Sequence, residues 1–278
     1  MFELFEKSAF ASSRTVTQLY STSFSRGISA LNKKFRNPIY GIYGFVRFAD
    51  EIVDTFHQFP QQELLDQFRR ETHEAIERKI SLNPVLYAFQ KTVHQYGIEP
   101  ELIDAFFSSM QMDLDHKRYD EKFYTEYIYG SAEVVGLMCL KVFSENDHTL
   151  YERLRPYAQR LGAAFQKVNF LRDVQSDFLE RGRIYFPQVD FHHFSDQVKQ
   201  SIEREIEDDF SVACQGIKML PNGSRFGVYL AYIYYRQLFK RIRKTAPSEI
   251  LKQRIRVPDL QKMVLIFQSY FRYRLHLI

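Results

Sequence analysis

The stretch GIYGFVRFADEIVDTF, residues 41–56, carries two aspartates, Asp50 and Asp54, at a spacing of four. Four residues make about one turn of an α-helix, so both carboxylates point the same way. Apolar residues occupy nearly all the other sides of this helix, which is typical of a buried element. Because a buried carboxylate needs a cationic partner or a metal ion, the stretch predicts a buried helix that directs acids toward such a partner.

A second stretch, RLGAAFQKVNFLRDVQSDF at residues 160–178, repeats the pattern. One stripe along it holds a small residue followed only by possible oxygen ligands: Gly162, Gln166, Asn169, Asp173 and Asp177. Either aspartate pair alone would be interpreted as solvated surface charge, but a solvated face is usually richer in Lys and Glu. The two stretches together favour the other interpretation, in which two helices face each other across a cavity.

Four carboxylates that converge on a cavity repel one another unless cations lie between them. Hard oxygen ligands with room for water suit Mg²⁺, which in such sites also binds substrate phosphates. We therefore predict a magnesium site, with Mn²⁺ as a substitute, formed by Asp50, Asp54, Asn169, Asp173 and Asp177. Arg47 shares a stripe with the first aspartate pair and is a candidate partner for the acids or for a phosphate.

Apolar side chains recur at intervals of three and four along all 278 residues, and strand-like alternation is almost absent. The 11 Gly and 9 Pro form no linker, so we expect one all-α domain, residues 1–278, of about ten helices. The expected helices are residues 4–24, 36–57, 60–80, 84–96, 99–112, 120–130, 131–144, 148–179, 197–217, 223–244 and 258–276. Breaks are expected at Asn37–Pro38, Phe59–Pro60, Asn83–Pro84, Glu99–Pro100, Phe186–Pro187, Pro221–Gly223 and Ala246–Pro247. The 26 Phe and 18 Tyr indicate either a large aromatic core or a large apolar cavity.

The bulk properties narrow the class of protein. A net charge of +4 fits an anionic ligand or membrane surface, and with no dense basic run or known motif we expect no nucleic-acid partner. Cys139 and Cys214 form neither a disulfide framework nor a metal spacing, which fits a reduced, cytoplasmic protein. The opening MFELFEKSAF does not have the pattern of a signal peptide, and no stretch approaches the length of a membrane span. The final FQSYFRYRLHLI suits either peripheral contact at the inner membrane face or a helix docked on the protein body.

Five stretches carry the most distinctive motifs. They are YSTSFSRGISAL at 20–31, IYGIYGFVRFADEIVD at 39–54, MQMDLDHKRY at 110–119, YIYGSAEVVGLM at 127–138 and LGAAFQKVNFLRDVQSDFLERGRIYFP at 161–187. Together they resemble the squalene/phytoene synthase family of head-to-head prenyl synthases, over residues 20–262. The last stretch, with its Arg-Gly-Arg-x-Tyr-x-Pro tail, is the most specific. The resemblance implies an all-α isoprenoid-synthase fold, with helices around a deep central cavity and the aspartate pairs at its mouth.

The resemblance also implies an activity. Two allylic prenyl diphosphates would bind with magnesium, and one would lose diphosphate to give an allylic cation. The double bond of the second would trap this cation as a cyclopropylcarbinyl diphosphate, and a second ionisation, rearrangement and proton loss would give a linear hydrocarbon. Because diphosphate leaves readily only when its charge is neutralised, metal ions and basic side chains suit this chemistry.

The same resemblance assigns site residues. The expected catalytic residues are Asp50, Asp54, Asp173, Asp177 and Tyr129, the last as a pocket tyrosine that stabilises a cation or relays a proton. The expected substrate-binding residues are Ser21, Ser23, Phe24, Tyr43, Arg47, Gln166, Asn169, Arg172, Arg183, Tyr235 and Arg256. Aromatic and apolar walls that stabilise a carbocation would be formed by Phe24, Tyr129, Val135 and Phe165. Structural alternatives stay open, such as a helix cap for Ser21 and a packed core position for Tyr129.

One position departs from the family pattern. Where family members usually carry a small residue, the chain has Glu133, which would pair with a basic residue or reshape the pocket.

Several functions within and beyond the family remain open. Chain length, the expected lack of a C-terminal membrane anchor and the form of YIYGSAEVVGLM favour the condensation of two geranylgeranyl diphosphates (C20) to phytoene, in carotenoid biosynthesis. The alternative is a C15-using relative that makes dehydrosqualene, or squalene with NADPH. An alternative of another class is a non-catalytic member that acts as an assembly or scaffold protein. We expect a monomer or a homodimer.

Overall fold

The computed structural model describes residues 1–115 and 118–275. These residues form helices and short connections, and the only extended pairing within them is an isolated bridge between Arg118 and Ile184. The prediction of an all-α fold is therefore confirmed. His116 and Lys117 of the central motif, and residue 276 at the expected end of the last helix, lie outside the described residues.

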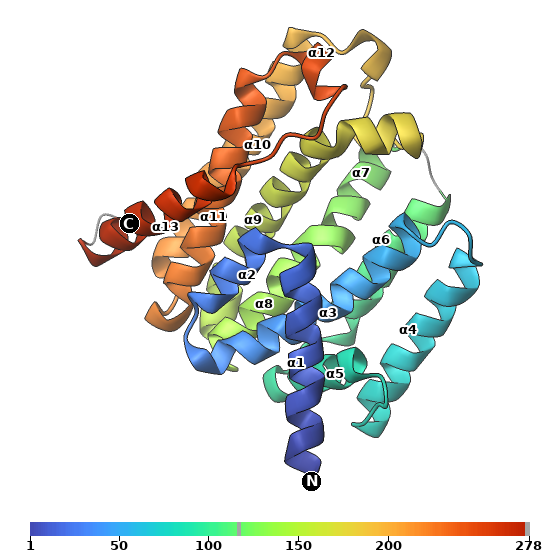
Figure 1. Cartoon of the computed structure of the whole chain (residues 1–278), viewed down its shortest axis with the longest axis vertical. Coiled ribbons are helices and arrows are strands. Elements are labelled where there is room, and N and C mark those ends of the chain that lie inside the picture. The colour runs from blue at the N-terminus through green and yellow to red at the C-terminus, as the bar shows by residue number, and fades with distance from the viewer. Residues whose placement is uncertain (116–117, 276–278) are drawn as a thin grey trace.

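Thirteen α-helices, with short π- and 3-10-helices between them, follow one another along the described chain (Figure 1). The α-helices are α1 Phe2–Tyr20, α2 Thr22–Ser29, α3 Lys33–Asp54, α4 Gln61–Arg78, α5 Pro84–Tyr96, α6 Pro100–Asp115, α7 Glu121–Ile128, α8 Val134–Ser144, α9 His148–Val174, α10 Asp196–Met219, α11 Asn222–Lys244, α12 Pro247–Ile250 and α13 Asp259–Arg274. The π-helices are η1 Tyr129–Glu133 and η2 Gln175–Glu180, and the 3-10-helix is η3 Phe191–His193.

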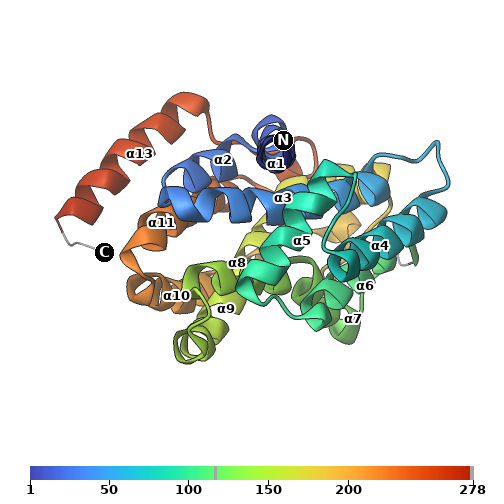
Figure 2. The same cartoon turned by 90° about the horizontal axis from the view of Figure 1, so that it is seen from below.

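Two clusters of buried apolar residues make up the core. The first is built mainly from α3, α5, α6 and α8, and in it Phe45 stacks on Phe89 with ring centroids 3.9 Å apart. The second is built mainly from α9, α10 and α11, and in it Phe170 stacks on Tyr185 at 4.2 Å. Figure 2 shows α4, α6 and α7 at one end of the molecule and α10, α11 and α13 at the other. Residues of both clusters line a central cavity, so the aromatic content serves a core and a cavity together.

Local signals explain why some helix ends were predictable. Helix α5 covers the predicted residues 84–96, because Asn83 accepts hydrogen bonds from the N–H groups of Val85 and Leu86 and Pro84 occupies the first turn. At its other end Gly97 adopts φ +59°, the left-handed conformation that favours glycine. Both ends of α5 could therefore be predicted from the sequence.

Two predicted boundaries were wrong. The break at Asn37–Pro38 does not occur: Pro38 is buried inside α3, which starts at Lys33 after Asn32 accepts a hydrogen bond from the N–H of Lys34. A proline removes only one helical N–H, and the burial of this helix outweighs that loss. The helix expected over 4–24 divides at Ser21, whose backbone is extended and whose Oγ accepts a hydrogen bond from the N–H of Phe24 at 3.2 Å.

Three other predicted helices contain π-helical residues. The helices expected over 120–130 and 131–144 form one run interrupted by η1, and the helix expected over 148–179 changes to η2 at Gln175. Close packing accompanies η1, since a Cβ on Gly162 of α9 would lie 2.6 Å from the carbonyl oxygen of Ala132. Gly162, the small residue of the predicted ligand stripe, therefore allows the backbone of a neighbouring helix to approach closely.

Within the described residues, no helix is both long enough and apolar enough to cross a membrane.

Candidate active site

The candidate residues, except Tyr129 and Arg183, lie along one deep cavity of about 1030 Å³. Its lining on α9 runs from Asp173 to Leu154, 19 positions apart (173 minus 154), or about 28 Å at 1.5 Å per residue. On α3 the lining runs from Asp54 to Ile39. Ordinary small-molecule pockets occupy about 300–1,000 Å³, so this cavity suits a large, elongated ligand.

The two aspartate pairs lie at the same end of this cavity. Asp50 and Asp54 come from the end of α3, Asp173 from the end of α9, and Asp177 from η2, and all four line the cavity. Arg181 joins the two sides: its Nη1 donates to Asp177 Oδ1 at 2.8 Å and its Nη2 donates to the carbonyl oxygen of Asp54 at 3.4 Å. The structure therefore brings together two pairs that are far apart in sequence.

Further arginines neutralise the acids. Arg47 lies 3.5 Å from Asp50, and Arg172 and Arg254 lie 2.5 and 2.7 Å from the two oxygens of Asp173. All three arginines line the cavity, and so does the predicted Arg256. A cluster of cations and anions at one end of an apolar cavity can hold the anionic head of a ligand and reorganise when it binds.

Sequence reasoning missed Arg181 and Arg254. Arg181 follows Asp177 by one helical turn, a spacing that favours an ion pair. Arg254 lies two residues before the predicted Arg256, in a stretch outside the helices. Both signals were present, but each is common on protein surfaces and gains meaning only once the cavity is known.

Burial and crowding shift the protonation of two of the acids. Burial, and to a lesser degree the nearby Asp54, raise the pKa of Asp50 to about 7, against the lowering effect of Arg47. Burial and Asp173 likewise raise the pKa of Asp177 to about 7. Near neutral pH the site therefore holds carboxylates whose charge is only partly compensated, and a bound cation would stabilise the ionised forms.

The donor set fits magnesium, although the ion's ligands are not pre-assembled. Among the described residues, no group of three or more acidic, His or Cys side chains is close enough together to hold a metal ion. Mg²⁺ commonly uses one or two carboxylates together with substrate phosphates, so the four aspartates suit an ion that arrives with a phosphorylated ligand. The predicted ligand Asn169 is engaged otherwise, since its Oδ1 accepts a hydrogen bond from Tyr235 at 3.2 Å.

The partners of Arg47 satisfy only part of its guanidinium group. Arg47 pairs with Glu51 and places its guanidinium 4.4 Å from the centroid of the Tyr20 ring. Its Nε is nevertheless buried and has no hydrogen-bond partner among the described residues. Buried donors in native proteins are almost always satisfied, so this nitrogen is an exception beside the cavity.

A buried cluster behind the aspartates was not predicted as part of the site. Asp113 accepts hydrogen bonds from the hydroxyl groups of Tyr119, Tyr127 and Tyr185 at 3.2, 2.7 and 2.9 Å. Arg183 lies 3.8 Å from the same carboxylate. Burial raises the pKa of Asp113 to about 6, although Arg183 and the tyrosine hydroxyls lower it. Asp113 lies in the central motif, whose resemblance to the family was the available signal.

Arg183 has a different position from the one expected. It is not among the residues that line the cavity, but its Nη1 donates to Asp54 Oδ1 at 2.7 Å and its Nη2 donates to the carbonyl oxygen of Val53 at 3.1 Å. Its guanidinium thus holds the end of α3 from behind, which makes it a residue that positions Asp54 rather than one that contacts a ligand.

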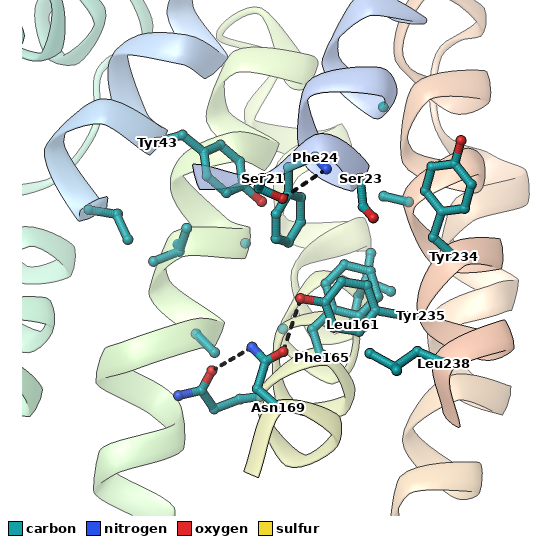
Figure 3. Close-up of a pocket in the computed structure, with 18 of the residues that line it drawn as sticks. Ser21, Ser23, Phe24, Tyr43, Leu161, Phe165, Asn169, Tyr234, Tyr235 and Leu238 are labelled. Atoms are coloured by element: carbon teal, nitrogen blue, oxygen red, sulfur yellow. Dashed lines mark hydrogen bonds between the residues drawn. The ribbon is translucent and has the colours of Figure 1, made fainter. Parts of the chain in front are cut away.

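Aromatic rings line the cavity next to the charged end (Figure 3). Phe24 lies 4.7 Å from Tyr43, and Phe165 stacks on Tyr235 at 3.9 Å between ring centroids. Figure 3 shows the Tyr235 hydroxyl directed at Asn169, whose Nδ2 in turn donates to Gln166 Oε1 at 3.4 Å. Ser21 and Ser23 line the same region, and Ser21 also caps α2, so its structural alternative holds as well.

Two residues of the π-helix η1, Tyr129 and Glu133, lie outside the cavity lining. Tyr129 is absent from the residues that line the cavity and packs against the first core cluster, whereas Tyr127 and Val135 do line it. Tyr127 was overlooked because both tyrosines fit the motif equally well. Glu133 also lies outside the lining, and its Oε2 accepts a hydrogen bond from Gln159 at 2.9 Å. It therefore belongs to a polar contact between helices and does not reshape the cavity.

Comparisons with known proteins agree with the geometry. The family model of squalene/phytoene synthases matches residues 17–261. The chain is 27% identical to the phytoene synthase of Arthrospira platensis, over 94% of this chain and 92% of that protein. It is 25% identical to the 4,4'-diapophytoene synthase of Staphylococcus haemolyticus, over 87% and 90% of the two chains.

A solved structure extends the likeness to three dimensions. A dehydrosqualene synthase crystallised with a ligand superposes with a TM-score of 0.83 at 23% identity, covering 98% of this chain and 99% of that one. The expected isoprenoid-synthase fold is thereby confirmed. Since the family model spans most of the sequence, the chain belongs to the squalene/phytoene synthase family, whose members join prenyl diphosphates head to head.

Proposed function

We propose that the protein is a magnesium-dependent phytoene synthase. It condenses two geranylgeranyl diphosphates head to head, through prephytoene diphosphate, to phytoene with release of diphosphate, in carotenoid biosynthesis. The observation that carries the proposal is the shape of the cavity. Acids and arginines gather at one end, the lining extends along about 28 Å of α9, and the part of it from Phe165 to Leu154 is apolar and aromatic. A ligand with an ionic head and long hydrocarbon tails fits this arrangement.

The charged end would bind the diphosphate groups. Arg47 offers an unpaired Nε, and Arg172 and Arg254 stand beside Asp173. Asp50, Asp54, Asp173 and Asp177 would hold magnesium, which neutralises the charge that accumulates on departing diphosphate. With diphosphate bound, the arginines would pair with its phosphate oxygens and leave the carboxylates free to hold the metal ion.

The aromatic part of the cavity would protect and stabilise the allylic cation. The faces of Phe24, Phe165, Tyr43 and Tyr235 carry the partial negative charge of aromatic rings. Burial raises the pKa of Tyr43 and Tyr235, so neither hydroxyl ionises at neutral pH to become a competing nucleophile. Water exclusion by these rings would favour rearrangement over hydrolysis.

The choice of the C20 donor is supported by similarity to phytoene synthases. The C15 alternative is also supported, since a 4,4'-diapophytoene synthase and the structure of a dehydrosqualene synthase are among the similar proteins. Chain length would be decided where the cavity ends, far from the aspartates.

Product analysis separates these possibilities. The purified protein with magnesium is offered geranylgeranyl or farnesyl diphosphate, each with and without NADPH, and hydrocarbons are identified by mass spectrometry. We expect a C40 product from the C20 donor without NADPH. A C30 product from the C15 donor alone would transfer the proposal to the C15 alternative, with NADPH dependence marking squalene. No product from either donor, in a folded protein, would contradict the enzyme proposal and favour the scaffold alternative.

A further inference from the structure

Helix α13, Asp259–Arg274, exposes a row of large apolar side chains. Leu260, Val264, Phe267 and Phe271 recur at spacings of four, three and four residues, and they are exposed by 79%, 46%, 59% and 62%. Leu275, four residues beyond Phe271, is exposed by 66%. We call these five residues the α13 stripe. Because the spacing follows the helical period, they lie on one side of the helix and form a continuous surface.

The orientation of α13 is the reverse of that of an ordinary surface helix. Its inner side packs on α11 through residues that include buried Ser269 and partly buried Tyr273, whose ring lies 5.2 Å from that of Phe226. The Tyr234 hydroxyl donates to the carbonyl oxygen of Lys262 at 3.3 Å. A surface helix normally turns its apolar stripe inward. Here Phe and Leu side chains face solvent, which marks an interaction surface.

The C-terminal part of the chain, which carries the stripe, is strongly basic in sequence. Residues 236–275 contain 11 Lys and Arg against the two acids Glu249 and Asp259, a net of +9. The whole chain has a net charge of +4, so all its other residues together carry −5. Charge is therefore concentrated on the C-terminal part, where it favours an anionic partner.

Part of this charge lines a groove beside α13. The groove, of about 750 Å³, lies between α10, α11 and α13. Arg236 on its wall pairs with Glu207 at 2.5 Å. For the groove residues Lys240, Lys244 and Arg272, no ion pair occurs with any described residue. These three cations remain available to phosphate groups.

The stripe also adjoins the mouth of the cavity. Asp259 and Lys262, in the first turn of α13, line the cavity, and Lys262 Nζ donates to Thr22 Oγ1 at the start of α2 at 2.8 Å. Leu19, at the end of α1, lines the cavity and is 79% exposed. Figures 1 and 2 show α1, α2 and α13 on the same side of the molecule. The first turn of α13 and the exposed Leu19 therefore both border the cavity.

We propose that α13 docks the protein on an anionic lipid bilayer. The α13 stripe enters the boundary between headgroups and acyl chains, and the basic groove binds headgroup phosphates. A second copy of the chain fits this surface poorly, because two regions of +9 would face each other and repel. The proposal concerns binding alone and does not depend on the proposed reaction.

Vesicle flotation tests the proposal with the full-length protein and no substrate. Vesicles of phosphatidylcholine and of an equimolar phosphatidylcholine–phosphatidylglycerol mixture are compared at low and high salt. We expect strong binding to the mixed vesicles that weakens with salt, and weak binding to phosphatidylcholine alone. Absence of binding to the mixed vesicles at low salt would overturn the proposal.

Two double variants assign the binding to its parts. Phe267→Ser with Phe271→Ser should weaken binding to mixed vesicles by at least about tenfold, since two exposed rings are lost. Lys240→Gln with Lys244→Gln should weaken it by about 30-fold, which corresponds to about 1 kcal/mol per basic residue. The matched control for the apolar pair is Ile80→Ser with Leu82→Ser, which removes exposed side chains between α4 and α5 and should change nothing.

The alternative occupant gives a distinct result. Sedimentation velocity would report a second copy on this face as a dimer that Phe267→Ser with Phe271→Ser converts to a monomer, and that outcome would replace the lipid proposal. Unchanged vesicle binding of the same double variant, with unchanged thermal unfolding, would equally overturn it. Loss of vesicle binding with an unchanged sedimentation coefficient supports the proposal.

Discussion

Arg183 reaches across the molecule to Asp54, 129 residues away in sequence, and donates a hydrogen bond to its Oδ1 at 2.7 Å. The same guanidinium donates to the carbonyl oxygen of Val53 at 3.1 Å. The last turn of α3 is thus held by a residue from the loop that follows η2. An ion pair usually fixes two side chains, but this one also fixes the end of a helix.

Replacing Arg183 by Lys should lower activity by about 10–100-fold, the usual effect of removing a group that orients a metal ligand. A lysine has one amino group and cannot bond the Asp54 carboxylate and the Val53 carbonyl in the same fork geometry. The measurement is kcat with a magnesium titration. The control Arg69→Lys changes an exposed pair with Asp104 and should leave both quantities unaffected. A fully active R183K would show that Asp54 needs no such support.

Replacing Asp50 by Asn should abolish turnover and stabilise the metal-free protein more at about pH 8 than at about pH 5. The pKa of Asp50 is raised to about 7 in the folded state, above its usual value of about 4. The raised pKa contributes stability that is full below about pH 4 and is lost as the pH rises through about 7. The Asp50→Asn variant has no carboxyl group to ionise at this position, so it does not lose stability in this way as the pH rises. Thermal unfolding in a chelator at the two pH values checks the sign, and a variant less stable than the wild type at the higher pH would refute it.

Tyr127→Phe should reduce activity by about tenfold, as expected when a supporting hydrogen bond to the site is removed. The Tyr127 hydroxyl lies in the cavity wall and donates to Asp113 at 2.7 Å, so its loss disturbs the group that faces Arg183. Tyr129→Phe is the matched control and should have a smaller effect, because Tyr129 is not among the cavity-lining residues. If steady-state kinetics showed a larger loss of activity for Tyr129→Phe than for Tyr127→Phe, the sequence-based prediction of Tyr129 as the pocket tyrosine would be supported instead.

Ser131→Ala should raise the thermal unfolding temperature. The Ser131 Oγ is buried in the cavity lining without a hydrogen-bond partner among the described residues. Removing an unsatisfied buried hydroxyl should raise the free energy of unfolding by about 1 kcal/mol, which corresponds to about 2–4 °C in unfolding temperature for a protein of this size. Ser109→Ala is the control: the Ser109 hydroxyl donates to Phe106 at 2.7 Å, so its loss should lower the temperature. A lower temperature for S131A would imply a partner that the hydroxyl finds in solution.

Features set by local periodicity could be predicted from the sequence. The aspartate pairs, the α5 boundaries and the all-α fold all follow from spacing within one element. Features that depend on where other elements pack could not. Ser21 divides two helices, Pro38 is accommodated inside one, and Arg254 has a role only because its loop lies beside Asp173. Tyr127 and Tyr129 are equivalent in the motif, and only the packing of η1 distinguishes them.

The π-helix η2 keeps the residues that follow α9 aligned with the other side of the cavity. Each residue of an α-helix turns the chain by about 100°, and a π-helical turn holds one residue more than an α-helical turn. If Gln175–Glu180 were α-helical at the same length, everything beyond this segment would be rotated by about 100°, which would carry Arg181 and Arg183 away from Asp54. The wider π-helical turn absorbs this rotation. The contacts of the two arginines with the end of α3 therefore depend on the backbone conformation of a segment that makes none of those contacts itself.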